Sequence, residues 1–204
     1  MNYKNILFYL GIFSLLVSIL SLFNTLYSIY FDFNLGINTY IITFGISSSI
    51  GFVCCYTGHQ DYKNISFIEQ IVFIFFGFLF IPFLISIPYY LSIYNIAFLD
   101  AYFESVSGFT TTGFSIINNI KHFDESLLLW RSSSQWLGGL FFLFAIIGTL
   151  GNRQIKIKPT YLVSGSATGR NFYSNFSYNL IRIITIYLSS TIFIFFLFCL
   201  AKIR

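Results

Sequence analysis

The sequence contains very little charge. Only 9% of its 204 residues are Asp, Glu, Lys or Arg, whereas about 25% is usual for a soluble domain. An ordinary soluble protein is therefore excluded. Several apolar runs reach the roughly 20 residues that an α-helix needs to cross the hydrocarbon layer, and the alternating segments of about ten residues that build a membrane barrel are not visible. We expect an all-α, multi-pass membrane protein.

The few charges also exclude a nucleic-acid partner. The formal net charge is +4, but the basic residues lie at the ends of apolar runs and form no stripe for a nucleic acid. Membrane orientation explains them better, because cytoplasmic loops carry an excess of Lys and Arg. The basic loop 151–177 is therefore predicted to be cytoplasmic. The N-terminus and the linker 59–66 then lie on the same side, and the region 92–124 lies on the outer side.

Cysteine and histidine, which supply most metal sites, are scarce, with three Cys and two His in the chain. The cysteines have neither metal-ligand nor disulfide spacing, so we interpret them as small core residues; they are Cys54, Cys55 and Cys199. A membrane hydrolase built on Ser107 would need His59 or His122, and neither lies in an apolar helix near a carboxylate. The sequence therefore predicts no enzyme, and we expect no cofactor.

Five apolar runs predict transmembrane helices, and one shorter segment predicts a helix that cannot span. The long helices are expected at about 6–30, 37–57, 67–91, 125–150 and 178–201. The shorter segment, about 95–107, lies between the third and fourth of these. At about 1.5 Å per residue it measures about 15–20 Å, roughly half of the hydrocarbon thickness of about 30 Å.

The segment GFTTTGFS, residues 108–115, follows the short helix and is a poor helix former, with three β-branched Thr between two Gly. Non-helical backbone is tolerated at membrane depth only when it is buried in protein or lines an aqueous cavity. We therefore predict a re-entrant element, in which a short helix enters the membrane and an extended strand returns to the same side. Gly113 is expected to take a positive φ, which Thr cannot hold comfortably.

This shape suits a cation. The C-terminal end of a half-helix carries the negative end of its dipole, and successive carbonyls of an extended strand can replace the hydration shell of an ion. Short re-entrant loops of this kind also occur in transporters and water channels.

Charged residues flank this element. Asp100 and Glu104 share a helix face, where like charges repel. For Glu104 we predict a buried pair with Arg131, because an ionisable residue near a membrane helix should find a partner away from lipid. For Asp100 a helix-start role and a vestibule role stay open. Arg131 begins the polar block RSSSQ, which either lines or braces a pore or serves helix packing alone.

The stretches DAYFESVSGFTTTGFSII and LLLWRSSSQWLGGL, preceded by GFLFIPF, resemble the first pore repeat of the Trk/Ktr/HKT potassium uptake proteins. That resemblance implies a selectivity filter whose backbone carbonyls coordinate K⁺, contributed by Thr110, Thr111, Thr112 and Gly113. It implies Phe109 and Phe114 as flanking support for the filter, along with the predicted pair Glu104 and Arg131. The implied function is potassium ion uptake across the cell (inner or plasma) membrane, by a protein whose N-terminus is cytoplasmic.

The resemblance also divides the chain. It implies an N-terminal helix pair at 1–58, the linker 59–66, a first helix-pore-helix repeat at 67–150, the basic loop 151–177, and the outer helix of an incomplete second repeat at 178–204. A ring of carbonyls needs about four strands, and we find one. The remaining pore repeats are expected from a longer chain, of which this would be the N-terminal part, or from other copies of this one. The alternative is a non-conducting accessory or truncated membrane protein.

Further expected partners are the lipid bilayer and a cytoplasmic nucleotide-binding regulatory subunit, as in the family that the chain resembles. Positive-inside bias explains the charge of the loop 151–177 equally well. Coupling of transport to Na⁺ or H⁺, and the preference for K⁺ over Na⁺, stay open at this point.

Overall fold

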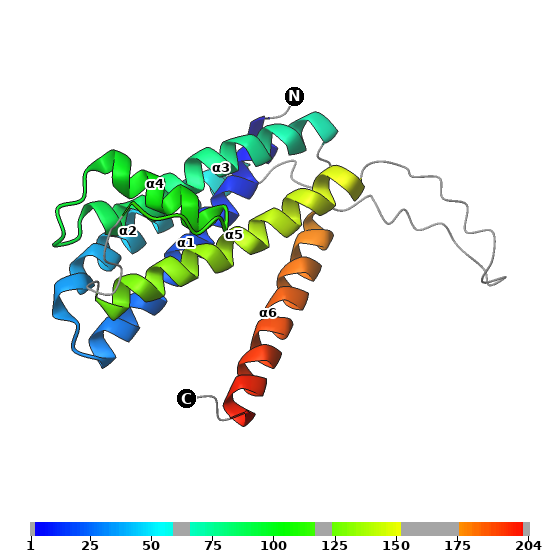
Figure 1. The fold of residues 1–204 in the computed structure, drawn as a ribbon. Coiled ribbons are helices and arrows are strands. Elements are labelled where there is room, and N and C mark those ends of the chain that lie inside the picture. Colours follow the sequence, from blue (N-terminus) through cyan, green and yellow to red (C-terminus); the bar gives the residue numbers. More distant parts are fainter. Residues whose placement is uncertain (1–2, 59–65, 117–123, 152–175, 202–204) are drawn as a thin grey trace.

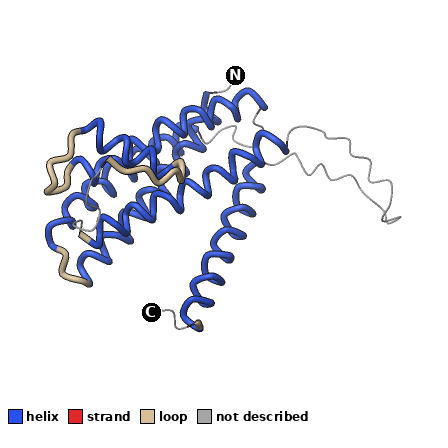
Figure 2. The backbone as a smooth tube through the Cα atoms, in the orientation of Figure 1, coloured by secondary structure: helices blue, strands red, loops and turns tan. Residues whose placement is uncertain are grey.

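The computed structural model describes residues 3–58, 66–116, 124–151 and 176–201. The described residues form six helices, whose arrangement is drawn in Figure 1. They are α1 (Tyr3–Tyr30), α2 (Asn34–Gly58), α3 (Phe67–Tyr90), α4 (Phe98–Phe109), α5 (Glu125–Gly151) and α6 (Phe176–Leu200). The described residues contain no strand (Figure 2). Each expected helix is present with its ends within three residues of the predicted positions.

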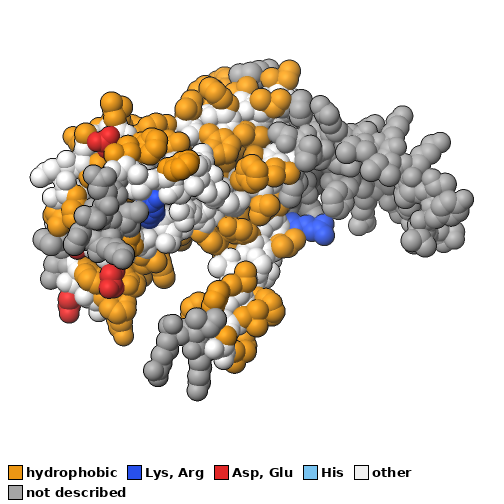
Figure 3. Space-filling model, viewed as in Figure 1, with side chains coloured by type: hydrophobic (Ala, Val, Ile, Leu, Met, Phe, Trp, Pro, Cys, Tyr) orange, Lys and Arg blue, Asp and Glu red, His pale blue; other side chains and the backbone are white. Residues whose placement is uncertain are grey.

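The prediction of an all-α, multi-pass membrane protein is confirmed. Four helices are long and apolar enough to cross a membrane, namely α1, α2, α3 and α6. Helix α5 has 27 residues and is long enough to span, but its polar block 131–135 lowers its hydropathy. Figure 3 shows apolar side chains spread over the described helices with few charged side chains among them. The division of the chain into repeats stays a prediction. His59, His122, nearly all of the linker 59–66 and most of the loop 151–177 lie outside the described residues.

Helices α1 and α2 pack along each other more extensively than any other pair. Glycines make this approach possible: a Cβ on Gly11 would lie 2.8 Å from Cys55 Sγ, and one on Gly51 would lie 2.8 Å from the Leu15 side chain. Small residues let helices come close in lipid, where no hydrophobic force drives them together. This contact also accounts for Cys55 as a small packing residue, in agreement with the sequence analysis.

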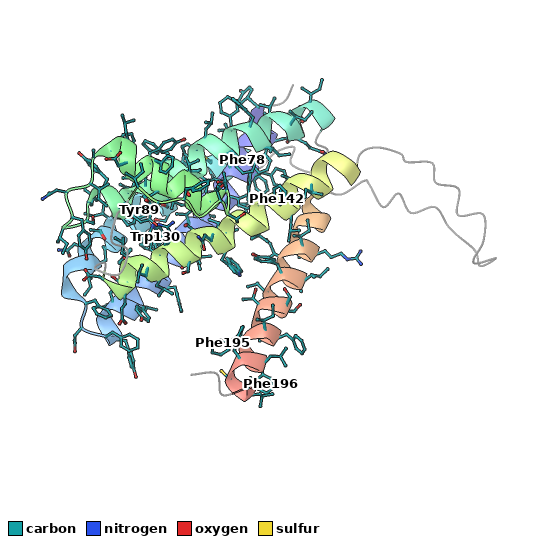
Figure 4. The ribbon with its side chains drawn as sticks, viewed as in Figure 1. Phe78, Tyr89, Trp130, Phe142, Phe195 and Phe196 are labelled. Atoms are coloured by element: carbon teal, nitrogen blue, oxygen red, sulfur yellow. The ribbon has the colours of Figure 1, made fainter. Side chains whose placement is uncertain are left out.

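The core lies between α1, α3 and α5 and is built of aromatic rings. Phe13 contacts Phe73 at a centroid distance of 6.0 Å and Phe141 at 4.9 Å, and all three side chains are at most 1% exposed. Trp130 of α5 is also buried, and its Nε1 donates to the carbonyl of Ile85 at 3.0 Å. Figure 4 shows Trp130 and Tyr89 inside the packed part of the molecule. Trp130 is therefore a packing residue.

Helix α3 begins with a capping box, in which Ser66 and Glu69 each accept a hydrogen bond from the other's backbone N–H. The helix continues through Pro82 and Pro88. By contrast, α6 contacts only α5 closely, and its second half extends away from the other helices, as Phe195 and Phe196 show in Figure 4.

Candidate functional site

Helix α4 is half as long as its neighbours and ends near the middle of two of them. Its 12 residues measure about 18 Å at 1.5 Å per residue. The last residue, Phe109, is fully buried and packs on Phe78 of α3 at 5.8 Å and on Phe141 of α5 at 5.2 Å between ring centroids. A helix that starts at one end of the bundle and stops at mid-length has the predicted re-entrant shape.

Two glycines let the end of α4 approach α5. A Cβ on Gly138 would overlap the carbonyl oxygen of Phe109, and a Cβ on Gly108 would lie 2.5 Å from Ser134 Oγ. The backbone of α4 therefore touches the backbone of α5 at Gly138. This contact fixes how far α4 enters the bundle. The glycines thus serve direct packing of α5 on α4, and the question of whether the polar block also lines or braces a pore stays open.

The chain leaves α4 through a left-handed turn. The N–H of Thr112 donates to the carbonyl of Ser107 at 3.0 Å, and the N–H of Thr111 donates to that of Gly108 at 2.9 Å. This is the pair of bonds that defines a Schellman motif, whose first residue beyond the cap takes a positive φ. That residue is Thr111, with φ 57°. The Thr-Gly turn, residues 110–113, thus closes the C-terminal end of α4.

The backbone angle of Gly113 agrees with the prediction, with φ +81°. Thr111 also takes a positive φ, which the sequence does not predict. The hydrogen bonds of the turn impose the left-handed conformation on this β-branched residue, which disfavours it.

Three carbonyls of this turn point away from α4 because of the orientation of their peptide planes. The N–H groups of Thr111, Thr112 and Gly113 all point back at carbonyls in the last turn of α4. In a planar trans peptide the C=O points opposite to the N–H. The carbonyls of Thr110, Thr111 and Thr112 therefore point away from the helix end, and no hydrogen bond from the described residues reaches them. All four residues of the turn are exposed.

The return segment, residues 113–116, runs back along α4. Ser107 Oγ donates to the carbonyl of Phe114 at 2.6 Å. One turn earlier on α4, Glu104 Oε1 accepts from Ser115 Oγ at 2.6 Å and from the N–H of Ile116 at 2.8 Å. The chain therefore travels antiparallel to α4 towards its starting side, as predicted for a re-entrant element.

Arg131 of α5 connects the same groups. Its Nη1 lies 2.7 Å from Glu104 Oε2, and the Glu104 side chain is 0% exposed, so the predicted buried pair is present. Nη2 donates to the carbonyl of Gly113 at 3.0 Å and to that of Phe114 at 3.3 Å. We call Glu104, Ser107 and Arg131 the brace. Together they hold the return segment against α4 and α5.

The predicted filter and flanking residues thus lie in different environments. Thr110, Thr111 and Thr112 present exposed carbonyls, whereas the carbonyl of Gly113 accepts a hydrogen bond from Arg131. Coordination of an ion by these four carbonyls stays a prediction. Phe109 supports the turn by burial. The ring of Phe114 is 70% exposed, and its carbonyl accepts from Ser107 and Arg131; its role as filter support stays a prediction.

Some of the site could not be read from the sequence. The sequence suggests only a nucleophile role for Ser107, whereas its hydroxyl donates to the carbonyl of Phe114. Ser133, within the polar block, accepts from Asn24 Nδ2 of α1 at 3.4 Å. The sequence signal for Ser107 was its position three residues after Glu104, on the same face of α4. Within the described ranges, no three His, Cys, Asp or Glu side chains gather as a metal site.

The loop that precedes α4 is tied to the start of α5. Tyr94 Oη accepts a hydrogen bond from the N–H of Asp124 at 2.9 Å, and burial raises the pKa of the Tyr94 phenol. Asp100 lies in the first turn of α4, where a carboxylate stabilises the helix dipole. Its vestibule role stays a prediction.

Replacing Thr111 with Gly is expected to raise the free energy of unfolding by about 1 kcal/mol, because Gly adopts a positive φ without steric cost. Thr112→Gly is the matched control: Thr112 does not have a positive φ, and its Gly variant should destabilise. Thermal unfolding of the two purified variants in detergent measures the difference. Destabilisation by Thr111→Gly equal to that by Thr112→Gly would contradict the strain at Thr111.

Comparison of the sequence with known proteins finds cation and potassium transporters among its relatives. A cation transporter of Methanocaldococcus jannaschii, described as uncharacterized, is 34% identical over 137 residues, which are 67% of this chain and 28% of that protein. The Trk system potassium uptake protein TrkH of Halomonas elongata is 47% identical over 55 residues, 26% of this chain and 11% of that protein. TrkG of Escherichia coli is 38% identical over 56 residues, 28% of this chain and 12% of that protein.

No protein-family model matches the chain, and no solved structure does. The chain spans less than a third of the length of each relative named here. Two of these relatives are described as potassium uptake proteins and the third as a cation transporter, and the chain has the membrane-spanning helices that such a relationship requires. The chain is therefore a homologue of the Trk-type potassium uptake proteins.

Proposed function

We propose that this protein takes part in potassium ion uptake across the cell membrane, as the ion-translocating subunit or as a part of it. The observation that carries the proposal is the Thr-Gly turn, where three successive carbonyls point away from the end of a half-length helix. A dehydrated cation needs such oxygens in place of its water shell. The relatives named above support K⁺ as the ion.

The carbonyls of Thr110, Thr111 and Thr112 form one wall of the filter in this proposal. The carbonyl of Gly113 stands at its outer end, where Arg131 also contacts it at 3.0 Å. About four such walls surround an ion, so the others come from further pore repeats of a longer chain or from other copies. The exposure of residues 110–114 fits a surface that such neighbours cover.

Orientation and further partners belong to the same proposal. The N-terminus and the loop 151–177 lie in the cytoplasm of a cell whose inner or plasma membrane holds the protein, and a nucleotide-binding subunit regulates transport from that side. The proposal leaves open the coupling of transport to Na⁺ or H⁺. Asp100 and Glu104, at the start and middle of α4, lie on the side from which the ion enters.

A second candidate function is a non-conducting accessory membrane protein. The observation in its favour is that the described residues contain one turn of this kind, and that α6 is almost entirely uncovered. A protein that cannot complete a filter would still insert and bind to other helices.

Growth of a host that lacks potassium uptake distinguishes these candidates. The chain is expressed alone and within the complete coding region that contains it, and growth is measured at limiting K⁺. Gly113→Ala is expected to abolish rescue, because Ala disfavours the φ of +81° that Gly113 adopts. A Cβ at this position meets open space, so crowding would not be the cause. Gly45→Ala is the matched control, since Gly45 also has open space but lies within a helix.

Each outcome decides the question. Rescue by the chain alone indicates four copies of one filter wall, and rescue only by the complete coding region indicates that other segments supply the rest. No rescue in either form, with the protein present in the membrane, rejects potassium uptake in favour of the accessory role. Rescue that survives Gly113→Ala rejects the filter assignment.

A further inference from the structure

We propose that the charge balance between Arg131 and Glu104 sets the affinity of the filter for its cation, which makes Arg131 an affinity-determining residue as well as part of the brace. This inference rests on the proposed function. It assigns to one side chain of α5 a contact with the ion pathway itself, through the carbonyl of Gly113.

The geometry places a permanent positive charge at the outer end of the Thr-Gly turn. Nη2 of Arg131 lies 3.0 Å from the carbonyl oxygen of Gly113 and 3.3 Å from that of Phe114. A guanidinium stays protonated in proteins and only donates hydrogen bonds. A carbonyl that accepts from it has one lone pair and part of its negative potential already engaged. The Gly113 carbonyl therefore binds a cation more weakly than those of the three threonines.

Glu104 cancels this charge at short range. Its Oε2 lies 2.7 Å from Nη1 of Arg131, and its side chain is 0% exposed while that of Arg131 is 13% exposed. Away from the pair, a cation in the filter experiences two opposite charges whose effects nearly cancel. Removing one member leaves a single charge in a water-poor site. By Coulomb's law, a unit charge at about 8 Å with an effective dielectric constant of about 20 changes cation affinity roughly thirty-fold.

The inference makes opposite predictions for the two members of the pair. Without the Glu104 charge, the remaining guanidinium repels the cation and the apparent KM rises. Without the Arg131 charge, the carboxylate attracts the cation, so that the apparent KM falls and release slows, with a lower kcat. When both are neutral, the KM returns towards that of the unmodified protein. A merely structural brace would instead lower the amount of folded protein in all three variants and move KM in no consistent direction.

The experiment measures Rb⁺ uptake into vesicles by the protein expressed from the complete coding region, for Glu104→Gln, Arg131→Gln and the double variant. A rise in KM of at least ten-fold for Glu104→Gln and a fall of similar size for Arg131→Gln are expected. Glu125→Gln is the charge control, because Glu125 is exposed at the start of α5 and solvent and salt screen its charge. It should leave KM unchanged.

A second variant and a second measurement guard against misfolding. Arg131→Lys keeps the charge, although an ammonium has no planar fork with which to reach Glu104 and both carbonyls. It should keep a KM near that of the unmodified protein even where the yield drops. In parallel, the rise of the unfolding temperature with K⁺, at constant ionic strength with choline, should be smaller for Glu104→Gln and larger for Arg131→Gln.

The inference is overturned if KM moves in the same direction for both charge changes. It is also overturned if KM stays unchanged while the unmodified protein transports. Both outcomes leave the proposed function intact. If the unmodified protein neither transports Rb⁺ nor gains stability from K⁺, the proposed function fails and this inference fails with it.

Discussion

Arg131→Ala is expected to destabilise the protein by about 3–5 kcal/mol, because it leaves the buried carboxylate of Glu104 without its charged partner. Glu104 is 0% exposed and would keep only its hydrogen bonds from Ser115 and Ile116. The carbonyl of Gly113 would lose its donor at the same time. The yield of folded protein in mild detergent and its unfolding temperature measure this loss.

The double variant Glu104→Gln, Arg131→Gln tests the cause. Two amides can hydrogen-bond each other, and no buried charge remains, so most of the stability should return. If the double variant is as unstable as Arg131→Ala, the loss arises from side-chain packing and not from an unpaired charge.

Gly138→Ala should have the second large effect, a loss of roughly 3 kcal/mol from overpacking. The added Cβ would overlap the carbonyl of Phe109 and lie 2.9 Å from its Cα. These are backbone atoms, so relief requires that the end of α4 move away from α5. The Thr-Gly turn follows directly after Phe109, and its carbonyls would move with it. Loss of ion uptake is therefore expected to exceed what the lower stability alone would cause.

The control is again Gly45→Ala, where nothing lies within 4 Å of the new Cβ. Inside an exposed helix position, Ala stabilises relative to Gly by up to about 1 kcal/mol. Unfolding temperatures of both variants in one detergent measure the difference. An unfolding temperature of Gly138→Ala equal to that of the unmodified protein would show that α4 and α5 are farther apart than described.

Most of the helices and the Glu104–Arg131 pair could be predicted from the sequence, because each depends on one segment or one pair of residues. The length of each apolar run predicts its helix, and the shortness of 95–107 predicts a helix that cannot span. The pairing of Glu104 with Arg131 follows from the cost of a lone charge near lipid. These are arguments about one segment or one pair at a time, and they need no knowledge of how the helices are arranged.

The details that depend on register could not be predicted. Schellman turns favour Gly beyond the cap, but this chain has Thr at position 111, so the sequence predicts a positive φ for Gly113 and not for Thr111. The contact of Arg131 with the Gly113 carbonyl depends on where the return segment lies along α4. That position is set by Ser107 and Glu104 together, and it cannot be derived from either residue alone.

The neutrality of the Glu104–Arg131 pair has a consequence for the membrane potential. A charge that moves through the whole membrane field gains or loses about 2.3 kcal/mol per 100 mV. The two charges of the pair are 2.7 Å apart and opposite in sign, so a movement that carries both of them together transfers no net charge from the pair across the field. The membrane potential then does almost no work on this pair when its two members move together.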